Sequence, residues 1–283
     1  NNLLFIQKNN NSENVQFSRP PVRSLLTFVI PIYQIISIKM VDKEWFKEWF
    51  DSHYYHLLYQ SRDEKEAHQF IQRLIGRFAL KKGLKIIDIA CGKGRHSKFI
   101  STLGFDVTGI DLSAESITYA QKDENKNLHF ARHDMREVFR PNYFDVALNL
   151  FTSFGYFESE EENKKAIQAM AENLVSQGHL VIDFLNVKKV IKTLPVKEQK
   201  TIENITFNIE KFLANGYITK EIAFDDEGRA FHFTEYVKNI QLHQFQEYLN
   251  LSGLEIIHTF GDYHLNSFDE TTSDRLILIC KKN

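Results

Sequence analysis

The stretch IIDIACGKGRHSKF, residues 86–99, joins an apolar run to two closely spaced glycines and a basic cluster. An apolar run that ends at such a glycine pair predicts a buried strand, a tight loop and then a helix. Glycines in a loop of this kind let the backbone approach a ligand closely. The identity of that ligand depends on the patterns that flank the loop.

The composition is that of an ordinary globular protein. The chain has 283 residues, of which 43% are hydrophobic and 25% charged, and its formal net charge of -2 gives no reason to expect a polyanionic partner. Its two cysteines, Cys91 and Cys280, cannot form a disulfide framework, which favours a reducing, cytoplasmic setting. No Cys/His array has the spacing of a zinc site, so no metal is expected.

The first 39 residues differ in character from the rest of the chain. They begin with Asn, are rich in Asn, and include an apolar stretch at residues 25–38 that is shorter than the ~20 residues of a membrane span. We interpret residues 1–39 as a leader or tail outside the fold, with a targeting segment as the alternative. A single domain is then expected over residues 40–283, without membrane attachment.

Helix and strand patterns alternate in the first part of this domain. An aromatic, helix-like segment over residues 41–59 precedes a second helix, which Gly83 is expected to end. Near-continuous apolar strands separated by helices indicate a mainly parallel sheet covered on both faces, an α/β fold. Strands are expected at residues 84–90, 105–110, 128–131, 143–150 and 180–185, with helices at 94–103, after Ser113 and from Ser159 to about residue 175.

The alternation stops after residue 186. Alternating apolar residues and the hairpin signal Asn215-Gly216 predict an inserted antiparallel β-meander, which we assign to residues 187–238. The meander is expected to serve as a substrate cap or as a dimerisation element. Its strands are expected at residues 205–213, 217–224 and 230–237, followed by a helix at 242–251 and closing strands at 254–260 and 275–280.

Three kinds of ligand are possible for the glycine loop: a nucleoside triphosphate, a dinucleotide or another adenosine-containing ligand. A nucleoside triphosphate loop needs the spacing GxxxxGK[ST], which is absent, and a dinucleotide fingerprint needs a third glycine where this chain has Ser97. Asp111 follows the second strand, where a carboxylate accepts hydrogen bonds from a ribose diol, and Asp134 follows the third, where it can accept from an adenine amine. These carboxylates favour an adenosine-containing ligand, and a nicotinamide cofactor remains the rival.

The segments DIACGKGRHS, VTGIDLS, HDMRE and FDVALNLFTSFGYF together resemble successive motifs of the class I S-adenosylmethionine-dependent methyltransferases, in particular their bacterial small-domain members. The resemblance covers roughly residues 43–283. It implies a Rossmann-like, seven-stranded, mainly parallel sheet with an antiparallel last strand formed by a closing hairpin. It also implies S-adenosyl-L-methionine as the cofactor.

Individual site residues follow from the same resemblance. Phe151 and Tyr156 are candidates for substrate binding, although the aromatic residues of this segment are equally explained as core, and no catalytic residue is identified. Cys91 is interpreted as a small loop residue and not as a nucleophile. The residues implied to bind the cofactor are Tyr59, Ala90, Cys91, Gly92, Gly94, Asp111, Leu112, Asp134, Met135 and Leu150.

These features predict a methyltransferase that acts on a nitrogen or oxygen of a small molecule. A nucleic-acid acceptor is disfavoured because residues 149–152 lack the N/D-P-P-Y/F segment that often stacks on a flipped base, and because no basic stripe interleaved with aromatic residues is present. An RNA or protein acceptor is the alternative within the enzyme class. A non-catalytic cofactor-binding module is the alternative outside it, and a homodimer is left open.

Overall fold

The computed structural model describes residues 45–59 and 64–283, and the expectation for residues 1–39 lies outside this part of the chain. Its helices are α1 (Trp45–Asp51), α2 (His53–Leu58), α3 (Glu64–Arg77), α4 (Arg95–Thr102), α5 (Ala114–Ala120), α6 (Glu160–Asn173), α7 (Val187–Thr193) and α8 (Leu242–Leu251). Its strands are β1 (Lys85–Ile89), β2 (Asp106–Asp111), β3 (Leu128–Arg132), β4 (Phe144–Asn149), β5 (Leu174–Leu185), β6 (Val196–Ile202), β7 (Ile205–Ala214), β8 (Tyr217–Asp226), β9 (Arg229–Lys238), β10 (Leu254–Phe260) and β11 (Arg275–Lys282).

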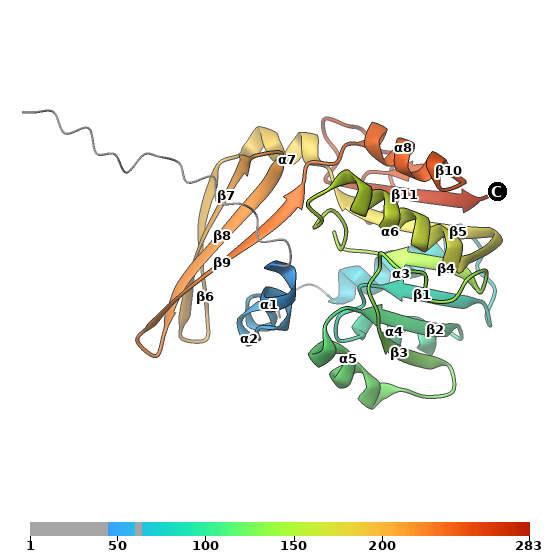
Figure 1. Cartoon of the computed structure of the whole chain (residues 1–283), viewed down its shortest axis with the longest axis horizontal. Coiled ribbons are helices and arrows are strands. Elements are labelled where there is room, and N and C mark those ends of the chain that lie inside the picture. Colours follow the sequence, from blue (N-terminus) through green and yellow to red (C-terminus); the bar gives the residue numbers. More distant parts are fainter. Residues whose placement is uncertain (1–44, 60–63) are drawn as a thin grey trace, which may run out of the picture. The chain divides into compact units, whose positions relative to one another are not determined.

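The main sheet has seven strands in the order β10-β11-β5-β4-β1-β2-β3 (Figure 1). β1 pairs in parallel with both β2 and β4, whereas β11 is antiparallel to both β5 and β10. The expected seven-stranded, mainly parallel sheet with an antiparallel last strand is therefore confirmed. Because the chain reverses its direction of travel across the sheet at β1, the crevice beyond the carboxyl ends of β1 and β4 is the expected place for a ligand.

Helices cover both faces of this sheet, as expected. Adjacent residues of a strand point to opposite faces. Ile86 of β1 belongs to one hydrophobic cluster with Phe70 of α3 and Ile100 of α4, and its neighbour Ile87 belongs to a second cluster with Ile167 of α6. Burial of each such side chain stabilises the fold by roughly 1.5–3 kcal/mol, so the two clusters hold the helices in place.

The inserted meander has one strand more than the sequence indicated. It is a separate antiparallel sheet of four strands in the order β6-β7-β8-β9, and α7 precedes it. The edge strand β6, VKEQKTI, was not predicted because it is largely polar and exposed. The seven-residue helix α7 was not predicted either. The three strands that were predicted correspond to β7, β8 and β9.

The N-terminal helices also differ from expectation. Within the described part of the expected helix at residues 41–59, the helix is interrupted at Ser52. The Ser52 side chain accepts a hydrogen bond from the Tyr55 N–H and caps α2. The second helix ends at Arg77, not at Gly83, and Ala79 adopts the left-handed conformation with φ 46°. A residue in that conformation cannot continue a right-handed helix.

Candidate functional site

A cavity of about 810 Å³ lies where β1, β2 and β4 end. The loop after β1, the last residue of β2 and the first residues after β4 form its walls, and side chains from α1, α2 and α4 complete them. Its volume falls in the range of ~300–1,000 Å³ that is typical of small-molecule sites. The topology and the cavity thus point to the same place in the fold.

The structure brings most of the predicted site residues to this cavity. Those that line it are Tyr59, Ala90, Cys91, Gly92, Asp111, Leu150, Phe151 and Tyr156. Gly94, Leu112, Asp134 and Met135 do not line it. The ligand contacts assigned to both groups of residues remain predictions.

Two glycines shape the loop in different ways. Gly92 has φ 56°, and a Cβ atom there would meet nothing within 4 Å. Gly94, the N-cap of α4, has φ 75°, and a Cβ atom there would lie 2.4 Å from the Phe130 ring. Gly94 therefore allows tight packing of α4 on β3, whereas the backbone at Gly92 is open to a ligand. Such an open cradle is what a bound cofactor requires.

Asp111 links the loop to the end of β2. Its Oδ2 accepts from the Gly92 N–H and its Oδ1 accepts from the Ser113 N–H, both at 2.8 Å. Burial raises the pKa of Asp111, and these backbone hydrogen bonds counteract the rise. A carboxylate has about four lone-pair sites, so each oxygen can accept one further hydrogen bond. The group therefore fits the ribose diol of an adenosine ligand.

Ser97 occupies the position at which a dinucleotide fingerprint has its third glycine. Its fully buried hydroxyl donates a hydrogen bond of 2.5 Å to Oδ2 of Asp88, the buried carboxylate of β1. Burial raises the pKa of Asp88 to about 6, although the Ser97 hydrogen bond lowers it. A serine at this place therefore pins the first turn of α4 to β1 through a side chain that glycine lacks.

We expect Asp88 to make the free energy of unfolding fall as the pH rises from about 4 to about 6. Its folded pKa of about 6 exceeds the ~3.9 of an unfolded aspartate, so in this window the folded state holds more protons. The contribution is at most about 3 kcal/mol and is constant above this window. Urea unfolding at pH 4.5 and 6.5 should show a smaller decrease for Asp88→Asn than for the wild type. Equal decreases in the two proteins would contradict the assignment.

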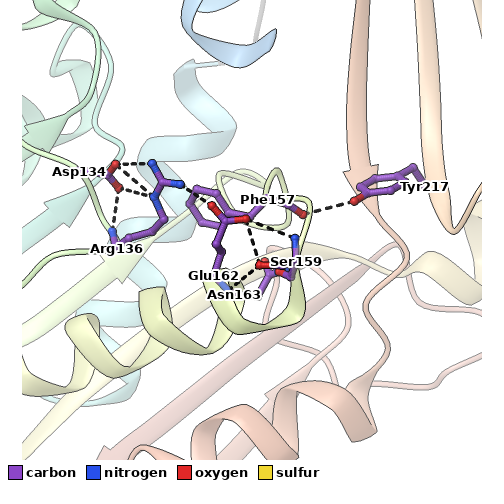
Figure 2. A network of polar contacts seen from close by, with 7 residues as sticks. All are labelled: Asp134, Arg136, Phe157, Ser159, Glu162, Asn163 and Tyr217. Carbon is purple, nitrogen blue, oxygen red and sulfur yellow. Dashed lines mark hydrogen bonds and ion pairs between the residues drawn. The ribbon is translucent and has the colours of Figure 1, made fainter. Parts of the chain in front are cut away.

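Asp134 is held by an arginine that the sequence analysis did not identify. Arg136 Nη2 donates to Asp134 Oδ2 at 2.6 Å, and Arg136 Nη1 donates to Glu162 Oε1 at 2.6 Å (Figure 2). The guanidinium also lies over the Phe157 ring, 4.8 Å from its centroid. Burial alone would raise the pKa of Asp134, but the hydrogen bonds from Arg136 lower it. Asp134 thus stays ionised as a hydrogen-bond acceptor.

The same network extends to the meander. Glu162 forms a capping box with Ser159 at the start of α6, as predicted from the sequence. In the segment before Ser159, the backbone carbonyl of Phe157 accepts a hydrogen bond from the hydroxyl of Tyr217, the first residue of β8, at 3.4 Å (Figure 2). The backbone carbonyl of Glu158 accepts from the same hydroxyl at 3.1 Å. Residues 157–162 therefore connect Asp134 to the inserted sheet.

The loop after β4 is strained, and hydrogen bonds with β5 and β11 hold it in place. Phe151 and Thr152 have φ values of 58° and 60°, a conformation that costs roughly 1–3 kcal/mol per residue. Asp183 of β5 accepts from the Phe151 N–H at 2.8 Å and pairs with Arg275 of β11, whose Nη2 lies 2.7 Å from Asp183 Oδ1. Arg275 Nη2 also donates to the Thr152 hydroxyl at 2.8 Å. This pair, which the sequence analysis missed, stabilises the wall on which Phe151 lies.

His96 is placed more clearly by the structure than by its sequence context. In the sequence, Arg95 and His96 fit a solvated helix start and a ligand contact equally well. His96 is buried, lines the cavity and stacks on Phe151 with 4.6 Å between ring centroids.

Cys91 also lines the cavity, where burial raises the pKa of its thiol. A raised pKa disfavours the thiolate that a nucleophile needs.

Aromatic side chains form one wall of the cavity. Ring centroids are 4.9 Å apart for Phe50 and Tyr55, 5.4 Å for Phe50 and Tyr156, and 4.9 Å for Tyr55 and Tyr59. All four residues line the cavity, whereas the nearby Phe154 is core. Phe151 and Tyr156 thus line the cavity, and their contact with a substrate stays a prediction. The faces of such rings attract cations such as a sulfonium or an ammonium group.

Within residues 45–59 and 64–283, no helix combines the length and the apolar character that a membrane crossing requires. The same residues contain no group of three or more His, Cys, Asp or Glu side chains suited to hold a metal ion.

Comparisons with known proteins identify a domain and a fold. A family model described as a methyltransferase domain matches residues 86–178. The dTDP-3-amino-3,4,6-trideoxy-alpha-D-glucopyranose N,N-dimethyltransferase of Streptomyces venezuelae is 31% identical over 99 residues, 35% of this chain and 41% of that enzyme. The chain therefore spans less than half of the length of this relative. A glycine/sarcosine N-methyltransferase of Aphanothece halophytica is 25% identical over 239 residues, 80% of this chain and 84% of that enzyme.

A solved structure shares the fold. The amino pentose methyltransferase of Micromonospora echinaspora, solved with S-adenosylmethionine bound, superposes with a TM-score of 0.63 at 18% identity over 82% of this chain and 98% of that one. The family match and this structure support S-adenosyl-L-methionine as the cofactor. Together with the sheet order and the loop after β1, they confirm that the chain contains a methyltransferase domain and has the fold of the class I S-adenosylmethionine-dependent methyltransferases.

Proposed function

We propose that this protein is a methyltransferase that transfers a methyl group from S-adenosylmethionine to an amine nitrogen of a small molecule. The observation that carries the proposal is the open backbone at Gly92 beside the Asp111 carboxylate, within a cavity of about 810 Å³. The aromatic wall favours an amine over a hydroxyl acceptor because the N-methylated product is a cation at neutral pH. The two relatives described above are named as N-methyltransferases, which supports the same acceptor atom.

Bound S-adenosylmethionine supplies a methyl group that its sulfonium has already activated. The Gly92 backbone and the Asp111 carboxylate would bind and orient the cofactor. Asp134, held by Arg136, does not line the cavity, so its hydrogen bond to the adenine amine stays a prediction. The aromatic wall would exclude water and stabilise positive charge, and Phe151 would set the direction of the acceptor's approach. Alignment of this kind supplies much of the rate of a displacement reaction.

A labelled-methyl screen tests the acceptor class. We expect transfer to small primary and secondary amines, for which nucleotide-linked amino sugars, glycine and sarcosine are the first compounds to try. Matched hydroxyl compounds and an RNA pool serve as controls. Transfer to RNA or protein alone, or cofactor binding without transfer to any pool, would contradict the proposal. The cytoplasmic location and the interpretation of residues 1–39 as a leader or tail outside the fold remain predictions, and a homodimer remains open.

Asp111→Ala is expected to weaken the binding of S-adenosylmethionine by about tenfold or more. The variant loses the hydrogen bonds to the ribose diol, which are worth roughly 1.5–3 kcal/mol each when the acceptor is charged. It also loses the two hydrogen bonds that hold the backbone of Gly92 and Ser113. Calorimetry on a variant shown to be folded by circular dichroism measures the effect. An unchanged dissociation constant would mean that the ribose binds elsewhere.

A further inference from the structure

The face of the meander that packs against α1 and α2 is largely apolar but carries a charged pair. Phe207, Ile222 and Phe224 of this sheet are buried in the same hydrophobic cluster as α1 and α2. Lys220 and Glu235 lie directly opposite each other on β8 and β9, with Nζ 3.6 Å from Oε2 and side chains only 13% and 16% exposed. An ion pair buried to this extent adds little to stability once desolvation is included. The pair therefore matters more through the groups that it contacts than through the free energy of unfolding.

Glu235 contacts both N-terminal helices. Its Oε1 accepts from Trp49 Nε1 of α1 at 2.7 Å and from the hydroxyl of Tyr59, the C-cap of α2, at 2.6 Å. Lys220 Nζ donates a hydrogen bond to the same Tyr59 hydroxyl. Because Tyr59 lines the cavity, this cluster joins the inserted sheet to the wall of the candidate site.

A second tyrosine of α2 makes a similar contact without reaching the cavity. The Tyr54 hydroxyl donates to Asp226 at the end of β8 at 2.8 Å, and its ring packs on Phe224 and Phe231 with centroids 4.6 and 4.8 Å away. Tyr54 is not among the residues that line the cavity. Both tyrosines contact the meander, but only Tyr59 lines the cavity. Variants at the two positions therefore distinguish attachment of the meander from its effect on the site.

We infer that Glu235 is a positioning residue which, together with Lys220, fixes the Tyr59 ring against the cavity. Through this contact the inserted sheet sets the geometry of the wall that faces cofactor and acceptor. Trp49 and Tyr59 share one oxygen of Glu235, so a displacement of β9 moves both helices together. The inference rests on the proposed function, since it assigns the meander a role in the same site.

The test compares conservative variants by calorimetric titration with S-adenosylhomocysteine, which binds without turnover. Tyr59→Phe and Glu235→Gln should each weaken binding by about tenfold, the change that ~1.4 kcal/mol produces. The double variant should bind no more weakly than either single variant, because both substitutions break the same contact. Tyr54→Phe, the matched control, should change the affinity by less than twofold.

Equal losses for Tyr54→Phe and Tyr59→Phe, additive losses in the double variant, or an unchanged affinity for Glu235→Gln would each overturn the inference. If Glu235→Gln does not fold, Tyr59→Phe and Tyr54→Phe still decide it. If the wild type binds no adenosyl ligand, the proposed function fails separately. Tryptophan emission then tests the contact without ligand: it should change in Tyr59→Phe and not in Tyr54→Phe, and the opposite result would overturn the inference.

Discussion

Asp183→Ala is expected to lower the free energy of unfolding by about 3–5 kcal/mol, the cost of leaving one buried charge without its partner. The Asp183 side chain is fully buried and that of Arg275 is only 19% exposed. The substitution leaves the Arg275 guanidinium without its carboxylate and removes the acceptor of the Phe151 N–H and the Tyr263 hydroxyl. It therefore also releases the strained loop after β4, so the wall that carries Phe151 should lose its fixed geometry.

Urea unfolding of the two proteins measures this loss. Glu210→Ala is the matched control, because Glu210 forms an ion pair of 3.0 Å with Lys197 whose side chains are 38% and 75% exposed. Exposed pairs contribute roughly 0–1 kcal/mol, so the control should unfold almost as the wild type does. A loss of less than 1 kcal/mol for Asp183→Ala would show that Arg275 finds other partners or water.

Gly94→Ala and Gly92→Ala are expected to fail in different ways. Both place alanine in the left-handed region, which costs roughly 1–2 kcal/mol. At Gly94 the new methyl also collides with Phe130, and overpacking adds roughly 1–3 kcal/mol, for a total loss of stability of about 2–5 kcal/mol. At Gly92 the methyl enters open space, where it competes with the cofactor and should weaken its binding by about tenfold or more.

Denaturant unfolding and calorimetry on both variants separate the two effects. The Gly94 variant should show the larger loss of unfolding free energy, and the Gly92 variant should show the larger loss of affinity relative to its modest loss of stability. If Gly92→Ala binds S-adenosylmethionine as tightly as the wild type, the cofactor does not lie against this part of the loop.

Local signals in the sequence were sufficient for much of the fold. Apolar runs located β1, β2 and β4 to within two residues, and the side chains of Ser113 and Ser159 cap the helices that were expected to follow them. The glycine loop and Asp111 were recognised because the chemistry of this site resides in short, contiguous segments. The edge strand β6 was missed because few of its residues are buried, so it lacks the apolar alternation on which strand prediction depends.

The site residues that were not predicted have partners that are distant in the sequence. Glu235 meets Trp49 across 186 positions of the chain, and Arg275 meets Asp183 across 92. No local pattern signals such a pair, since the two partners are far apart in the sequence and Glu235 and Arg275 alone resemble ordinary charges in strands. Arg136 is the exception: it stands two residues after Asp134 in the segment HDMRE, and this spacing was the one sequence signal that could have identified it.

Calorimetric titration of the wild type with S-adenosylmethionine, S-adenosylhomocysteine and NAD tests the central claim most directly. Asp111 can receive the ribose of either kind of cofactor, but Ser97 of α4, hydrogen-bonded to Asp88, stands where a dinucleotide fingerprint has its third glycine. We predict saturable binding of both adenosyl compounds, competitive with each other, and no heat from NAD. Binding of NAD without any heat from S-adenosylmethionine would contradict the account.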